Sequence, residues 1–132
     1  MSVEFDLSDL TRLAAAISEV PAAATKNLRQ ATEVTSRKVK DAWNGKLYSE
    51  GHAARTGRAI TYDITVSRDS VEGEIGAVRG SGRQAGIVRL LENGSVHNGA
   101  HGYGAGALHE NESDFEHGIE TAIDDAMNRA GL

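Results

Sequence analysis

The first part of the chain carries apolar residues at helical spacing. They recur every three or four positions, at Leu7, Leu10, Leu13, Ala14 and Ile17. This is the period of one face of an α-helix, and Asp6 or Ser8 can cap its N-terminus. The pattern predicts a first helix over residues 7–19.

A second helical stripe follows Pro21, which suits the first position of a helix because its missing N–H would be unsatisfied there anyway. The stripe is narrow and poor in large side chains: Ala24, Leu28, Ala31, Thr35, Val39 and Ala42. Asn44 and Gly45 tolerate the left-handed conformation that ends many helices. We expect a helix over residues 21–43 and a long loop over 44–58.

The pattern then changes to strict alternation. Apolar residues occupy every second position from Ile60 to Val66, and polar residues lie between them, as in a half-buried strand. Val71, Gly73, Ile75 and Ala77 repeat the alternation. We predict strands over residues 59–67 and 71–79, paired as an antiparallel hairpin. A third apolar run predicts a strand over 86–92, although five residues cannot separate strand from helix by period alone.

The last part of the chain divides into a loop and a helix. Residues 93–112 are rich in Gly, His, Asn and Ala, which indicates a long surface loop. Ser113 and Glu116 have the spacing of a capping box, and apolar residues continue at helical spacing from Phe115 to Met127. These features predict a C-terminal helix over residues 113–130.

The order of these elements predicts an α+β fold, because strands and helices are segregated along the chain. We expect one domain, residues 1–132, in which a small antiparallel β-sheet packs against two N-terminal helices and one C-terminal helix. The chain has 132 residues, 39% of them hydrophobic but only 5% aromatic. Much of the hydrophobic content is alanine, which buries little area, so the core should be thin and association between subunits is favoured.

Composition excludes several kinds of site and partner. The chain has no cysteine, so disulfides and thiolate metal sites are ruled out. No apolar run reaches the length of a membrane span, and the acidic N-terminus does not resemble a secretory signal. A net charge of −5 argues against sequence-specific binding to nucleic acid, which requires Lys and Arg at phosphates.

Charge is unevenly distributed along the sequence. Arginines lie between acidic N-terminal and C-terminal parts, among them Arg55, Arg58, Arg79, Arg83 and Arg89. A head-to-tail contact between subunits could use this asymmetry. Solvated surface charge is the alternative interpretation.

The histidines and glycines suggest chemistry only weakly. His97 and His101 have the spacing of metal ligands on a helix, but the neighbouring glycines argue against a helix there, so we interpret them as solvated loop residues. The glycine-rich stretches lack the strand, glycine turn and helix of a dinucleotide site. Carboxylates at four-residue spacing after residue 113 indicate an exposed acidic face. No catalytic, cofactor or metal site is predicted.

Two short passages resemble a known family. Residues 54–60, Ala-Arg-Thr-Gly-Arg-Ala-Ile, lead from a helix into a hairpin, and residues 90–95, Leu-Leu-Glu-Asn-Gly-Ser, precede a histidine-rich loop. In element order and motif spacing, residues 20–130 resemble the small tail-component family of long-tailed siphophages, which includes head–tail connector and tail-completion proteins. The chain departs from that family in having leucines before Glu92, where an aromatic is usual, and glycines where the loop usually has prolines.

The resemblance implies a non-enzymatic structural protein of the virion without a cofactor. It would form a homo-oligomeric ring, such as a hexamer or dodecamer, in the neck or upper tail, acting in tail completion or as a tail terminator. Its partners would be the stopper, terminator and tube proteins, with no membrane, and assembly would take place in the host cytoplasm. The expected partner-binding loop residues are Arg55, Thr56, Gly57, Arg58, Glu92, Asn93, Gly94, Ser95, His97, His101 and Tyr103.

Two alternatives stay open at this point. One is a small metal-binding domain or enzyme that uses the histidine-rich loop. The other is a small protein-binding module that acts as a monomer.

Overall fold

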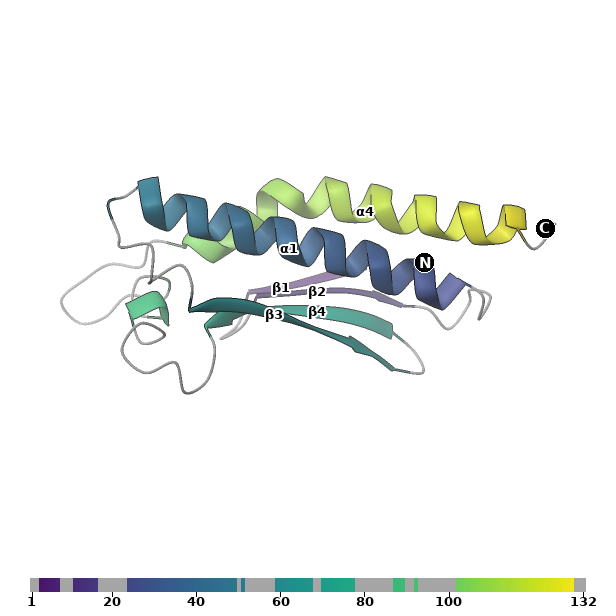
Figure 1. Cartoon of the computed structure of the whole chain (residues 1–132), viewed down its shortest axis with the longest axis horizontal. Helices are drawn as coiled ribbons and strands as arrows, with labels where there is room; N and C mark the ends of the chain where they lie inside the picture. The colour runs from purple at the N-terminus through teal and green to yellow at the C-terminus, as the bar shows by residue number, and fades with distance from the viewer. Residues whose placement is uncertain are drawn as a thin grey trace.

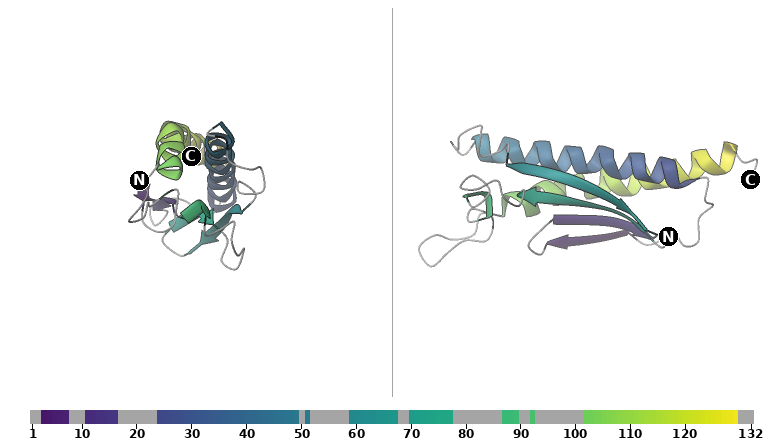
Figure 2. Two further views of the ribbon diagram at one scale, coloured as in Figure 1. Left: turned by 90° about the vertical axis from the view of Figure 1, so that its left-hand side faces the viewer. Right: turned by 60° about the horizontal axis from the view of Figure 1, so that its bottom comes forward.

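The computed structural model has two layers, a sheet and a pair of long helices that lie side by side on one of its faces (Figure 1). The structure describes residues 3–7, 11–16, 24–49, 51, 59–67, 70–77, 87–89, 92 and 102–129. The end-on view in Figure 2 shows both helices above the same face of the sheet. The predicted α+β class, with a small antiparallel sheet packed against helices, is confirmed.

The sheet has four antiparallel strands in the order β1-β2-β4-β3. They are β1 (Val3–Leu7), β2 (Thr11–Ala16), β3 (Ile60–Val66) and β4 (Ser70–Ala77). Two hairpins, one from each half of the chain, therefore join through β2 and β4 to make one sheet.

The helix predicted over residues 7–19 is wrong, because the described residues of this region form the β1–β2 hairpin. Val3, Phe5 and Leu7 alternate with Glu4 and Asp6, which is a strand pattern. The helical spacing that predicted a helix combined apolar residues of two separate short strands, such as Leu7 of β1 and Leu13 of β2. Tertiary pairing selects the strands, since the Cα of Leu13 in β2 is in register with Phe5 on one side and Gly73 on the other.

The predicted β3–β4 hairpin is confirmed. The register runs from Ile60 opposite Ala77 to Val66 opposite Val71 without a bulge. The turn is closed by the N–H of Ser67, which donates to the carbonyl of Ser70 at 2.8 Å. Val71 and Ile75 are fully buried, because this face of the hairpin lies beneath the helices.

Helix α1 (Thr25–Ser49) is longer at its C-terminal end than the sequence pattern indicated. The predicted end at Asn44 and Gly45 is wrong, because Trp43 and Leu47 are both buried and hold the next turn on the core. Gly51, with φ of 88°, follows the helix, and its N–H donates to the carbonyl of Tyr48 at 3.0 Å. Of the predicted loop 44–58, residues 44–49 are therefore helical, and residues 52–58 lie outside the described part.

Helix α4 (Tyr103–Arg129) begins a full ten residues before the predicted start at 113. Ala107, Leu108 and Asn111 are buried and extend the buried face of the helix toward its N-terminus. The predicted loop 93–112 is thus wrong over 103–112, Gly102 lies just before the helix, and residues 93–101 lie outside the described part. The predicted strand 86–92 is also wrong where it is described, because residues 87–89 and 92 are helical.

The two helices are antiparallel and close together. Trp43 of α1 packs on Gly104 of α4, and Ala31 of α1 lies beside Gly118, so the sequence directions oppose. Helix α1 lies over β3 and β4, whereas α4 contacts β2. The core between the layers is built from the buried residues Leu13, Leu28, Val39, Ile60, Val71, Ile75, Leu108, Phe115 and Ile119.

Candidate functional site

One end of the molecule holds Glu92 and Tyr103, two of the predicted partner-binding residues. The C-terminus of α1, the N-terminus of α4 and the helical residues 87–89 lie there together, at the left of Figure 1. Residues 52–58 connect α1 to β3, and residues 93–101 connect Glu92 to α4. The described residues that flank these two motif-bearing segments lie at this end.

Two of the predicted residues, Glu92 and Tyr103, are described by the structure, and it places them near each other in space. Tyr103 is the first residue of α4 and is half-buried against the core. The other predicted residues lie outside the described part of the chain: Arg55, Thr56, Gly57, Arg58, Asn93, Gly94, Ser95, His97 and His101.

Glu92 caps helix α4. Its carboxylate oxygens accept hydrogen bonds from the backbone N–H groups of Gly104 at 2.7 Å and Ala105 at 3.1 Å. These N–H groups have no partner within the helix, and a negative charge at a helix N-terminus is favourable. Gly102, at φ of 64°, supplies no capping side chain of its own, so a residue from another segment takes that role.

Trp43 fixes the approach of α1 to this end of α4. A Cβ atom on Gly104 would lie 2.8 to 2.9 Å from three carbons of the indole ring. No side chain fits between the ring and the helix backbone. Sequence reasoning could identify Trp43 as a large residue on the last turns of the α1 stripe, but not its partner, because residue 104 was assigned to a loop.

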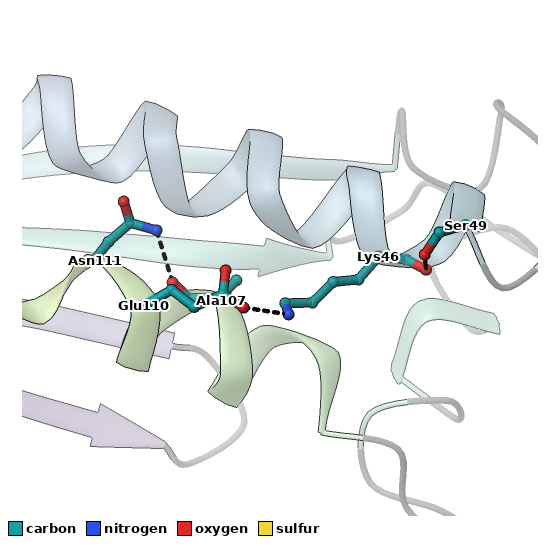
Figure 3. Close-up of polar contacts among 5 residues, drawn as sticks. All are labelled: Lys46, Ser49, Ala107, Glu110 and Asn111. Carbon is teal, nitrogen blue, oxygen red and sulfur yellow. Dashed lines mark hydrogen bonds and ion pairs between the residues drawn. The ribbon is translucent and has the colours of Figure 1, made fainter.

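Polar contacts also join α1 to α4 near this end, as Figure 3 shows. The Lys46 ammonium donates to the carboxylate of Glu110 across the helix pair. Within α4, the buried amide of Asn111 donates to the carbonyl of Ala107 at 2.8 Å. The Lys46–Glu110 pair is partly exposed, so its contribution to the free energy of unfolding is small. Its main effect is on how the two helices are positioned.

Between the two helices lies an open groove of about 420 Å³. Small side chains, among them Ala31 and Gly118, form part of its lining. Lys38 and Asp114 also line it and approach each other at 3.4 Å, with both side chains more than half exposed. A solvated ion pair of this kind lacks the desolvation that acid–base catalysis requires.

The two helices carry opposite charge. Helix α1 has six basic and two acidic side chains, whereas α4 has seven acidic side chains and one basic, not counting histidine. One side of the helical layer is therefore mainly basic and the other mainly acidic. Comparing the N-terminal, middle and C-terminal regions of the chain did not reveal this difference. A net charge computed for each predicted helix would have revealed it.

Histidines on α4 do not build a metal site with their neighbours. His109 is 84% exposed and its Nδ1 lies 3.7 Å from a carboxylate oxygen of Glu112, and His117 is also exposed. In the described part of the chain, no group of three or more His, Cys, Asp or Glu side chains could hold a metal ion. The residues His52, His97 and His101 lie outside that part.

Comparisons with protein-family models, with curated proteins and with solved structures gave no significant match. Among the described residues, neither long helix combines the length and apolar content that a membrane span requires. In the described part of the chain, the charged helix pair and the end of the molecule around Glu92 are the features that bear on function.

Proposed function

We propose that this chain is a structural subunit of a phage head–tail junction, in which it forms a homo-oligomeric ring that joins the head connector to the tail. The observation that supports the proposal is that the described residues flanking the two motif-bearing segments lie together. The C-terminus of α1, the start of β3, Glu92 and the N-terminus of α4 lie at one end of a two-layer body, and residues 52–58 and 93–101 follow or precede them in the sequence. The sequence resemblance to siphophage tail-completion proteins rests on the same two segments.

The body suits a role in assembly. Two long helices packed across a four-stranded sheet form a stiff support, and the capping by Glu92 ties residue 92 to the first turn of α4. Residues that follow Glu92 thus start from a fixed point. Segments that order only when they meet an adjoining ring would lose conformational entropy on binding, which makes joining selective for the correct partner.

Catalysis is not needed in this proposal. The role of the chain would be to present one surface to the next subunit and another to the adjoining stopper, terminator or tube protein, within the neck or upper tail of the virion. No cofactor or metal is invoked. Assembly would proceed in the host cytoplasm before the virion is released.

The test is a joining assay in the phage that encodes the chain. Deletion of the gene should give filled heads and separate tails, and addition of the purified protein should restore joined, infectious particles. Fully infectious particles made without the gene would overturn the proposal.

The motif-bearing segments are tested in the same assay. Arg55→Ala combined with Arg58→Ala should leave the circular dichroism spectrum unchanged yet reduce joining at least tenfold. The matched control is Arg129→Ala, because Arg129 is an exposed arginine at the opposite end of the helical layer. Joining at the wild-type level by the double variant would exclude residues 52–58 as a docking segment.

A further inference from the structure

The two lateral sides of the helical layer are opposite in charge. The outer flank of α1 comprises Lys26, Arg29, Glu33, Arg37 and Lys40, and the outer flank of α4 comprises Glu112, Glu116 and Glu120. The first set has four cations and one carboxylate, and the second has three carboxylates. Both lie on the outside of the helix pair, as the helical geometry requires.

For α4 the geometry follows from the residues that face α1. Asp114, Gly118 and Ala122 line the groove between the helices. Each acidic flank residue precedes one of these by two positions, a rotation of about 200° around the helix axis. Glu112, Glu116 and Glu120 are therefore directed away from α1.

For α1 the same argument holds, and a contact confirms it. Arg29 and Glu33 precede the groove residues Ala31 and Thr35 by two positions. The hydroxyl of Tyr62 donates to Glu33 at 3.4 Å, and the Lys40 ammonium lies 5.9 Å from the centre of the same ring. Tyr62 belongs to the edge strand β3, on the side of the sheet away from α4.

The charge of this basic flank is persistent. Arginine side chains are protonated in proteins at all ordinary pH values, and a hydrogen bond with Tyr62 further raises the pKa of Arg37. Lys26 and Arg29 are exposed.

We propose that the outer flank of α1 in one copy binds the outer flank of α4 in the next copy, so that the chain assembles head to tail. Contacts of this heterologous kind generate rings when the rotation between neighbours closes. A two-fold dimer is disfavoured, because it would place one basic flank on another or one acidic flank on another. The inference rests on the proposed function for the ring, and it names the surfaces that build it.

The charged residues of the two flanks also lie at matching levels along the helix axes. The Lys38–Asp114 ion pair and the packing of Ala31 beside Gly118 fix which residues of α1 and α4 are level within one copy. For neighbours packed side by side at the same height, Arg29 meets Glu120, and Arg37 meets Glu112 and Glu116. The cation at each of these levels therefore has a carboxylate of the neighbour opposite it.

A pair of charge-reversed variants tests the contact. Lys26→Glu with Arg29→Glu makes the α1 flank acidic, and Glu116→Lys with Glu120→Lys makes the α4 flank basic. Each variant alone would bring like charges together and should lose the assemblies that the wild type forms at low ionic strength, as measured by light scattering after size exclusion. An equimolar mixture should recover them, since copies alternating around the ring restore both contacts.

The matched control is Asp63→Lys with Asp125→Lys, which changes the net charge as the α4-flank variant does but at exposed positions on β3 and in the groove, off both flanks. It should assemble alone like the wild type and should not draw the acidic-α1 variant into full-size assemblies. Circular dichroism confirms that every variant is folded. Single-flank variants that assemble as the wild type does would overturn the contact.

Cross-linking gives a second, geometric test, because the chain has no cysteine of its own. Arg29→Cys and Glu120→Cys, prepared as separate proteins, should form a covalent dimer under oxidising conditions only when mixed. A covalent dimer of Arg29→Cys with itself would indicate a two-fold contact and overturn the head-to-tail arrangement. Loss of binding to duplex DNA in the acidic-α1 variant, with assembly unchanged, would assign the basic flank to nucleic acid instead.

The outcomes separate this inference from the proposed function. If the charge-reversed pair shows mutual rescue but the gene is dispensable for head–tail joining, the contact stands and the proposed function falls. If joining requires the gene but single-flank variants still join and assemble, the function stands and the contact falls. Should the wild type stay monomeric in solution, mutual rescue is scored in the joining assay, and its absence there overturns the contact.

Discussion

At the residue scale, the clearest change of role concerns Glu92. The sequence places it among loop residues that bind a partner, whereas its carboxylate accepts hydrogen bonds from two N–H groups at the start of α4. A cap of this kind acts on stability and on the position of neighbouring residues. Glu92 therefore has a structural role at the first turn of α4, in addition to any contact with a partner.

Glu92→Ala should lower the free energy of unfolding by about 0.5–2 kcal/mol, the usual effect of losing a helix cap. The N–H groups of Gly104 and Ala105 would lose their acceptor. Urea denaturation measures the change. The control is Asp124→Ala, which removes an exposed carboxylate of α4 far from the N-terminus of the helix. Equal stability of the two variants would show that the capping contact contributes nothing in solution.

Two glycines in the first turn of α4 should respond in opposite ways to alanine. A Cβ at position 104 would collide with Trp43, whereas at position 106 its nearest neighbour is the flexible end of Lys46 at 3.5 Å. We expect Gly104→Ala to destabilise the protein by about 1–3 kcal/mol through overpacking. Gly106→Ala should stabilise it by up to about 1 kcal/mol through helix propensity. Thermal unfolding of the two variants measures this difference in stability. Similar melting temperatures would contradict the close packing of Gly104 on Trp43.

At the scale of elements, the helices end where burial ends. Leu47 keeps α1 helical past Gly45, and Leu108 and Ala107 start α4 long before its apparent capping box. In both cases a glycine or a polar run suggested an end that the core overrode, because tertiary burial is worth more than local propensity. The sheet holds α1 equally closely, since Ser36 is buried directly over Gly73 of β4.

Gly73→Ala should therefore push α1 away from β4, because a Cβ there would overlap Ser36 Oγ. The expected loss is about 1–3 kcal/mol in the free energy of unfolding. Gly45→Ala, at an exposed helical glycine with open space around it, is the control and should raise stability by about 0.5–1 kcal/mol. Denaturant unfolding that shows no loss for Gly73→Ala would mean that α1 can shift on the sheet without cost.

At the scale of the whole molecule, the distribution of charge matters more than its total. A net charge of −5 suggests mild mutual repulsion between copies, yet the cations are concentrated on α1 and the carboxylates on α4. Opposite sides of one layer can then attract while like sides repel. Such a surface favours head-to-tail neighbours over two-fold pairs.

Assembly should consequently weaken with salt. Exposed charges are screened beyond about 10 Å at 0.1 M ionic strength and about 3 Å at 1 M. The native mass from light scattering should fall as NaCl rises across this range, while the melting temperature of the monomer changes little because its core is apolar. A native mass that grows with salt would instead indicate that copies associate through apolar surface.

The sequence by itself determined the α+β class, the β3–β4 hairpin and the helical nature of residues 25–43 and 115–129. In each of these segments the apolar period is long and matches the element that burial selects. Of the candidate site, the sequence supplied the residue types of both motif-bearing segments and the acidic face of the last helix.

Only the tertiary structure decided the rest. Residues 3–7 and 11–16 became paired strands because β2 pairs with β4, a partner more than fifty residues away in the chain, and no local pattern contains that pairing. Glu92 became a cap because α4 starts beside it. The polarity of the helical layer exists only because α1 and α4 lie antiparallel with their outer flanks apart, a consequence of packing both helices on one face of the sheet.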